Sequence, residues 1–135
     1  MSARHQRGFV AIEWVAAIGL LLLPVVLLVA TLPVWAERRH GATVAAREAA
    51  RVLVDGWPRA DPKAANEVAL EVAVDHGIAA DDVAVHVLAT GTHRGDDVRV
   101  EVVVTMPAIS VGGAVVGRWE YTATAVRRVD DFRSR

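Results

Sequence analysis

The stretch WVAAIGLLLLPVVLLVATLPVWA, residues 14–36, contains no ionisable side chain and decides the fold of this chain. About 20 apolar residues in a helix cross about 30 Å of hydrocarbon, so this stretch is long enough to span a membrane with some tilt. The core helix of a soluble protein is the alternative, but such a helix keeps a polar stripe that this stretch lacks. Trp14 and Trp35 stand near its ends, where indole rings favour the headgroup region. We therefore expect a transmembrane helix over residues 9–36, in which Pro24 and Pro33 each remove one hydrogen bond.

A cleavable secretory signal is a second interpretation of the same stretch. Residues 34–36, Val-Trp-Ala, have the spacing of small residues that signal peptidase accepts, and cleavage there would release a soluble domain beginning at Glu37. The apolar run is longer than the roughly 7 to 15 residues of a typical signal core. A carboxylate also lies within its beginning. Both features favour a retained helix over a signal removed after Ala36.

The residues before the apolar stretch, MSARHQRG at positions 1–8, are polar and basic and end in glycine. The chain continues as FVAIEW, so Glu13 is the fifth residue after Gly8 and Trp14 follows it. This segment resembles the class III signal of type IV pilins, in particular that of Tad/Flp pili, which reads glycine, four residues, Glu and an aromatic residue. Trp14 stands where the family usually has Tyr or Phe. The resemblance implies a leader of residues 1–8, cleavage between Gly8 and Phe9 by a prepilin peptidase, and retention of the helix.

Glu13 is unusual because it lies inside the apolar run. An ionised carboxylate in hydrocarbon costs about 2.5 to 3.5 kcal/mol, so such a residue usually has a partner or a function. Cleavage after Gly8 would create an amine at Phe9, about one helical turn away or on a neighbouring subunit. The resemblance implies that Glu13, with Trp14 beside it, pairs with this amine and sets the register between subunits. The alternative is that Glu13 merely extends to the headgroups from an interfacial first turn.

The distribution of arginines does not determine the orientation in the membrane. Positions 4 and 7 precede the apolar stretch, whereas positions 38, 39, 47 and 51 follow it. By the positive-inside rule this distribution favours a cytoplasmic C-terminal side. Processing by prepilin peptidase requires the opposite orientation, so the resemblance implies a cytoplasmic N-terminus and an extracytoplasmic domain over residues 37–135.

Two helical segments are expected in the C-terminal region. Residues 42–54, ATVAAREAARVLV, predict an amphipathic extension of the membrane helix, with Gly41 as a candidate break and Gly56-Trp57-Pro58 as its end. Its small-residue face suits close approach of another helix or of the chain's own sheet. Asp61 as N-cap, Pro62 at the first position and Gly77 as a stop predict a second helix. The face of the first segment comprises Ala42, Ala45, Ala46, Ala49 and Leu53.

Three strands follow in the sequence pattern. Residues 83–88 and 98–106 alternate in period two around the polar turn 90–97, which predicts an antiparallel hairpin. Residues 118–128 alternate similarly and predict a third strand. The apolar segment 107–117 is expected to connect the last two strands, either folded onto the core or exposed as a surface for a partner. The predicted fold class is α+β, with a single transmembrane helix, one more helix and a three-stranded antiparallel sheet.

Composition limits the chemistry of the chain. With 135 residues, a net charge of −1 and no cysteine, the chain lacks the charge of a nucleic-acid binder and has no thiolate for catalysis or zinc. Its histidines show no metal-binding spacing, its serines no nucleophile elbow, and Gly112-Gly113 is no phosphate loop. Paired aspartates stand at predicted element ends, where capping explains them. We therefore expect no enzyme activity, no metal and no cofactor. The histidines are His5, His40, His76, His86 and His93.

The region after the membrane helix extends the resemblance. An alanine- and arginine-rich helical extension and a final strand of the type GRWEYTATAVRRVDD at 117–131 resemble TadE-type minor pilins, also called pseudopilins. TadF-like relatives share the signal. The resemblance implies a pilin-like structural subunit of a Tad pilus assembly or secretion system. Its partners would be the prepilin peptidase, other minor pilins, the major pilin and the inner-membrane platform. The alternative is an unprocessed single-pass membrane protein whose extracytoplasmic domain binds a ligand.

Overall fold

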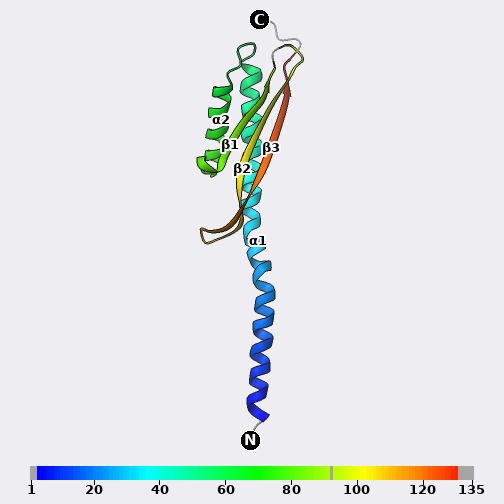
Figure 1. The fold of residues 1–135 in the computed structure, drawn as a ribbon, viewed down its shortest axis with the longest axis vertical. Coiled ribbons are helices and arrows are strands. Elements are labelled where there is room, and N and C mark those ends of the chain that lie inside the picture. Colours follow the sequence, from blue (N-terminus) through cyan, green and yellow to red (C-terminus); the bar gives the residue numbers. More distant parts are fainter. Residues whose placement is uncertain (1–2, 92, 131–135) are drawn as a thin grey trace.

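The computed structural model describes residues 3–91 and 93–130, with side chains described from residue 12 onward except at 92 and 111. Its elements are α1 (Ala3–Asp55), α2 (Pro62–Asp75), a short 3-10 turn η1 (Ala80–Asp82), β1 (Val83–Thr90), β2 (Asp97–Val111) and β3 (Ala114–Arg128). Figure 1 shows α1 as a long rod, with the other elements gathered around its C-terminal half. The fold is α+β, and its long apolar N-terminal helix, second helix and three-stranded antiparallel sheet agree with the sequence pattern.

The break expected at Gly41 is absent, because α1 continues without interruption through this residue to Asp55. Glycine is needed at position 41 because another segment of the same chain lies very close to α1 there. A Cβ on Gly41 would lie 2.8 Å from the Cβ of His76 and 3.1 Å from Cδ1 of Ile78. Real Cβ atoms essentially never lie within 3.0 Å of a heavy atom from another part of the chain. The glycine therefore lets His76 and Ile78, which follow the end of α2, pack directly onto α1.

We expect Gly41→Ala to destabilise the domain. Overpacking costs about 1 to 3 kcal/mol, whereas the better helix propensity of alanine returns up to about 1 kcal/mol, so the net effect is a loss. Urea unfolding of the full chain in detergent micelles measures it. Gly19→Ala is the control, because an added Cβ at Gly19 meets no atom within 4 Å. A Gly41→Ala protein as stable as the Gly19→Ala protein would contradict this explanation.

The two helices pack through alanines. On α1 the predicted face is buried throughout, and α2 contributes a matching row of small side chains. Asp61 caps α2, where its Oδ1 accepts a hydrogen bond from the backbone N–H of Lys63 at 2.9 Å, and Pro62 occupies the first turn. Small side chains allow helices to approach closely. The buried alanines are Ala42, Ala45, Ala46, Ala49 and Ala50 on α1 and Ala65, Ala69 and Ala73 on α2.

The sheet is an antiparallel meander in the order β1-β2-β3, and the helices cover one of its faces. Alternate residues of the central strand β2 are fully buried, as the period-two pattern predicted. Tyr121, Ala123 and Ala125 of β3 extend the same buried face. Leu53 at the end of α1 is the largest fully buried side chain of this core. The buried residues of β2 are Val98, Val100, Val102, Val104 and Met106.

Residues 107–117, expected as a connection, instead form the end of a long hairpin. Strand β2 continues to Val111 rather than ending at Met106, and β3 begins at Ala114 rather than at Arg118. Gly112 and Gly113 have φ values of +57° and +85°, and they form the tight turn between the two strands. Two central residues with positive φ match the twist of a hairpin, and glycine adopts them without strain. The prediction failed because Pro107 and three glycines resemble a loop in the sequence.

Candidate functional site

The predicted processing and assembly residues lie in the first turns of α1. The backbone of Gly8 and Phe9 belongs to this helix, but their side-chain surroundings lie outside the described residues. Glu13 is exposed, Trp14 is 67% exposed, and with Ala17 they line an open hollow on the helix surface. The four-residue spacing from Phe9 to Glu13 places both on one side of the helix, about 6 Å apart along its axis. This arrangement leaves the carboxylate of Glu13 accessible to a second molecule.

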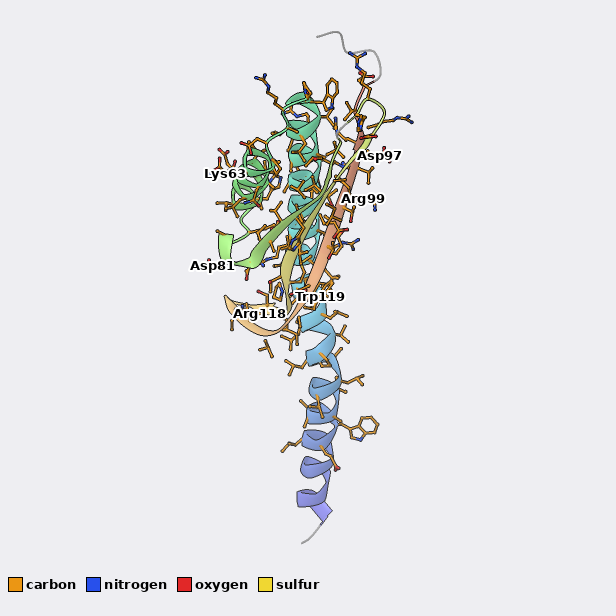
Figure 2. The ribbon with its side chains drawn as sticks, turned by 45° about the horizontal axis from the view of Figure 1, so that its top comes forward. Lys63, Asp81, Asp97, Arg99, Arg118 and Trp119 are labelled. Carbon is orange, nitrogen blue, oxygen red and sulfur yellow. The ribbon has the colours of Figure 1, made fainter. Side chains whose placement is uncertain are left out.

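Among the side chains that the structure describes, none forms a hydrogen bond or ion pair with Glu13. The cations labelled in Figure 2, Lys63, Arg99 and Arg118, belong to the C-terminal domain and not to the N-terminal half of α1. An acidic side chain in apolar surroundings needs such a partner. Within the described part of the chain, Glu13 therefore has its charge uncompensated.

The apolar part of α1 is exposed on all but one narrow face. Apart from Leu27, its large side chains from Ile12 to Leu32 are between 49% and 76% exposed, and this helix is long and apolar enough to cross a membrane. A contiguous apolar surface of this extent marks a membrane or protein contact rather than a surface in water. The large exposed residues include Ile12, Val15, Ile18, Leu20, Leu21, Leu22, Leu23, Val25, Val26, Leu28, Val29 and Leu32.

At the C-terminal end of the apolar stretch, α1 contacts the β2–β3 hairpin. Nε1 of Trp35 donates a hydrogen bond of 2.6 Å to the carbonyl oxygen of Pro107. The ring of Trp35 also meets that of Trp119 edge to face, with 6.1 Å between the centroids. Figure 2 shows Trp119 and the neighbouring Arg118 at the end of the domain closest to the apolar rod. Trp35 is therefore part of the folded domain as well as the last aromatic residue of the apolar stretch.

One turn further along α1, Arg38 ties the helix to the sheet and to η1. Its Nη1 donates to the carbonyl oxygen of Thr105 at 2.6 Å and to Oδ2 of Asp82 at 3.0 Å. Asp82 also lies 4.0 Å from Nη1 of Arg118. These side chains line a small cavity of about 40 Å³, together with Pro107 and Val115. The cluster was not predicted, because Asp81 and Asp82 were interpreted, like the other paired aspartates, only as capping residues at an element end.

The histidines form no metal centre in the described part of the chain. His40 and His76 bring their rings to 5.7 Å, next to Gly41. No group of three His, Asp or Glu side chains gathers around one point among the described residues. His5 lies outside the described side chains. The expectation of no metal, no cofactor and no catalysis stays a prediction.

The candidate site is thus an exposed acidic residue near the start of an apolar rod, whose other end is embedded in a small α+β domain. Compared with protein-family models, with curated proteins and with solved structures, the chain matches none of them.

Proposed function

We propose that this chain is a minor-pilin-like structural subunit of a Tad-type pilus assembly or secretion system. The observation that carries the proposal is the order Gly8, four residues, Glu13 and Trp14 at the start of a continuous, exposed apolar helix. In this proposal the leader of residues 1–8 is removed on the cytoplasmic side. The helix then spans the cytoplasmic membrane, and the α+β domain lies outside it.

The assembly step is lateral packing of membrane helices. Glu13 has no partner among the described side chains, and cleavage after Gly8 supplies a cation at the amine of Phe9. Within one subunit this amine belongs to the same helical side as Glu13, and in a bundle it can also meet Glu13 of a neighbour. Charge pairing in a low dielectric is strong, so it fixes the stagger between adjacent helices. The chain's partners are then other minor pilins, the major pilin and the inner-membrane platform.

The contacts of Trp35 favour a retained helix over an exported soluble domain. Cleavage after Ala36 would remove Trp35, with its hydrogen bond to Pro107 and its ring contact with Trp119. It would also expose the surfaces of Pro107 and Trp119 that Trp35 covers. A signal sequence that is discarded has no need of such contacts with the mature domain.

Coexpression with a Tad prepilin peptidase tests the proposal. We expect N-terminal sequencing of the membrane fraction to give Phe9 for the wild-type chain and an uncleaved N-terminus for Gly8→Ala. Gly19→Ala, the same substitution later in the helix, should leave cleavage intact. A mature chain beginning at Met1 or Ser2 would instead identify an unprocessed single-pass protein with an extracytoplasmic binding domain. A chain beginning at Glu37 would identify an exported domain.

A further inference from the structure

The part of the β2–β3 hairpin around Pro107 and Trp119 lies beside the C-terminal boundary of the apolar stretch. The contacts of Trp35 with Pro107 and Trp119 fix this position. Figure 1 shows that beyond this point the hairpin bends away from α1 to one side instead of following the rod. The hairpin is therefore the part of the domain closest to any membrane that α1 crosses.

A strip of reduced exposure on α1 shows how far along the rod the domain extends. Thr31 is fully buried, and Leu27 is half-buried in a row of exposed residues. These positions lie four and eight residues before Trp35, on the helical side that carries Trp35 and Arg38. Thr31 is about 6 Å nearer the N-terminus along the axis than Trp35. The covered side of α1 thus continues past Trp35 into the apolar stretch.

The length of the apolar helix indicates how deep the hairpin lies relative to a membrane that α1 crosses. Trp14 and Trp35 are 21 residues apart, and at 1.5 Å per residue they lie about 32 Å apart, close to the roughly 30 Å of a hydrocarbon core. Tryptophans at both ends of a span sit at headgroup level. Because Trp119 contacts Trp35, the base of the hairpin lies at the same level.

The hairpin has the composition of a membrane-contacting element. Residues 107–117 contain no ionisable side chain. Val116 is 65% exposed and stands opposite Ile109 in the ladder, so the two share one face. An exposed apolar strand end is unfavourable in water.

Basic side chains stand immediately beyond the two tryptophans. Arg38 and Arg118 flank Asp82, and Arg39 lies with its guanidinium 5.1 Å from the ring centre of Tyr121. The Arg118 side chain is 70% exposed. The order from the membrane outward is therefore apolar, aromatic and then charged, with Glu37 and Glu120 among these arginines. This order matches acyl chains, headgroup boundary and lipid phosphates, which arginines reach with their long side chains.

We propose that the β2–β3 hairpin is a second membrane contact, lying in the headgroup region of the leaflet on the domain's side, with Val116 and Ile109 towards the acyl chains. This inference rests on the proposed membrane span of α1. The hairpin then restricts the tilt of the rod relative to the membrane plane, because one side of the domain is attached to lipid and the other is not.

Site-directed spin labelling of the full chain tests the hairpin. The chain contains no cysteine, so Val116→Cys, Val126→Cys and Ile18→Cys each introduce a single labelling site. Val116 and Val126 are matched, since both are exposed valines of β3, and Ile18 reports on the apolar helix. The proteins are reconstituted into vesicles of phosphatidylethanolamine and phosphatidylglycerol. Collisions of the nitroxide with oxygen, which is lipid-soluble, and with a water-soluble nickel chelate are then compared.

We expect oxygen collisions to dominate at positions 18 and 116 and nickel collisions to dominate at position 126. Nickel dominance at both 116 and 126, with oxygen dominance at 18, would overturn the hairpin contact while leaving the membrane span intact. Protection of position 116 from both reagents would mean that a protein surface covers it, and would also overturn the proposal. Nickel dominance at position 18 would overturn the span itself, and the hairpin contact with it.

Discussion

Replacing Glu13 by Gln is expected to abolish pilus assembly while leaving the chain processed and inserted in the membrane. The substitution keeps the size of the side chain and removes its charge, so in the proposed assembly the amine of Phe9 loses its partner. An uncompensated charge in such a place costs about 3 to 5 kcal/mol. Because each 1.4 kcal/mol corresponds to about a factor of ten, the association of subunits should weaken by about two orders of magnitude or more. Electron microscopy of surface filaments, in cells whose sole copy carries the variant, measures the result.

Glu37→Gln is the matched control for this experiment. Glu37 is an exposed glutamate on the same helix, but it follows the apolar stretch instead of lying within it. Its replacement should leave filaments unchanged, and both variants should show Phe9 as the mature N-terminus. Normal filament numbers with Glu13→Gln would show that the carboxylate merely reaches the headgroups, which is the alternative left open by the sequence.

Replacing Leu53 by Ala is expected to destabilise the domain by about 2 to 5 kcal/mol, the usual range for a buried leucine truncated to alanine. Leu53 is fully buried in a core otherwise built mostly of alanine and valine, so few neighbours have side chains long enough to fill the space it leaves. A domain has a total stability of about 5 to 15 kcal/mol, and the loss is therefore a large fraction of it. Urea unfolding of the full chain in detergent micelles, followed by tryptophan fluorescence, measures it, because Trp57 packs against this core.

The control for the core substitution is Leu88→Ala. Leu88 lies on β1 and is 54% exposed, so the same chemical change should alter the stability by no more than about 0.5 kcal/mol. Equal losses for the two leucines would mean that the side of α1 carrying Leu53 is not the centre of the core.

Local patterns account for what the sequence predicted correctly. Valine recurs at every second position of β2 from Val98 to Val104, so the buried face follows from the two-residue repeat of a strand. The alanine face of α1 follows in the same way from helical spacing, and Asp61 with Pro62 marks the start of α2. In each case the signal lies within one element, where its periodicity can be read directly.

Contacts between distant segments could not be predicted in this way. Trp35 and Pro107 are 72 residues apart and Arg38 and Asp82 are 44 apart, so each pairing depends on how α1 lies against the sheet. Gly41 illustrates the same point, because glycine in a helix signals a break unless the segment packed against it is known. The proposed roles of Gly8, Phe9, Glu13 and Trp14 depend on molecules other than this chain, and they stay predictions.

The continuity of α1 from Ala3 to Asp55 has a mechanical consequence. Helical hydrogen bonding continues past Gly41, and the domain is held to Trp35 and Arg38, so the part of α1 from Trp35 to Asp55 moves with the sheet as one body. In the proposed membrane span, a change in the direction of the helix at Trp35 would therefore turn the sheet with it.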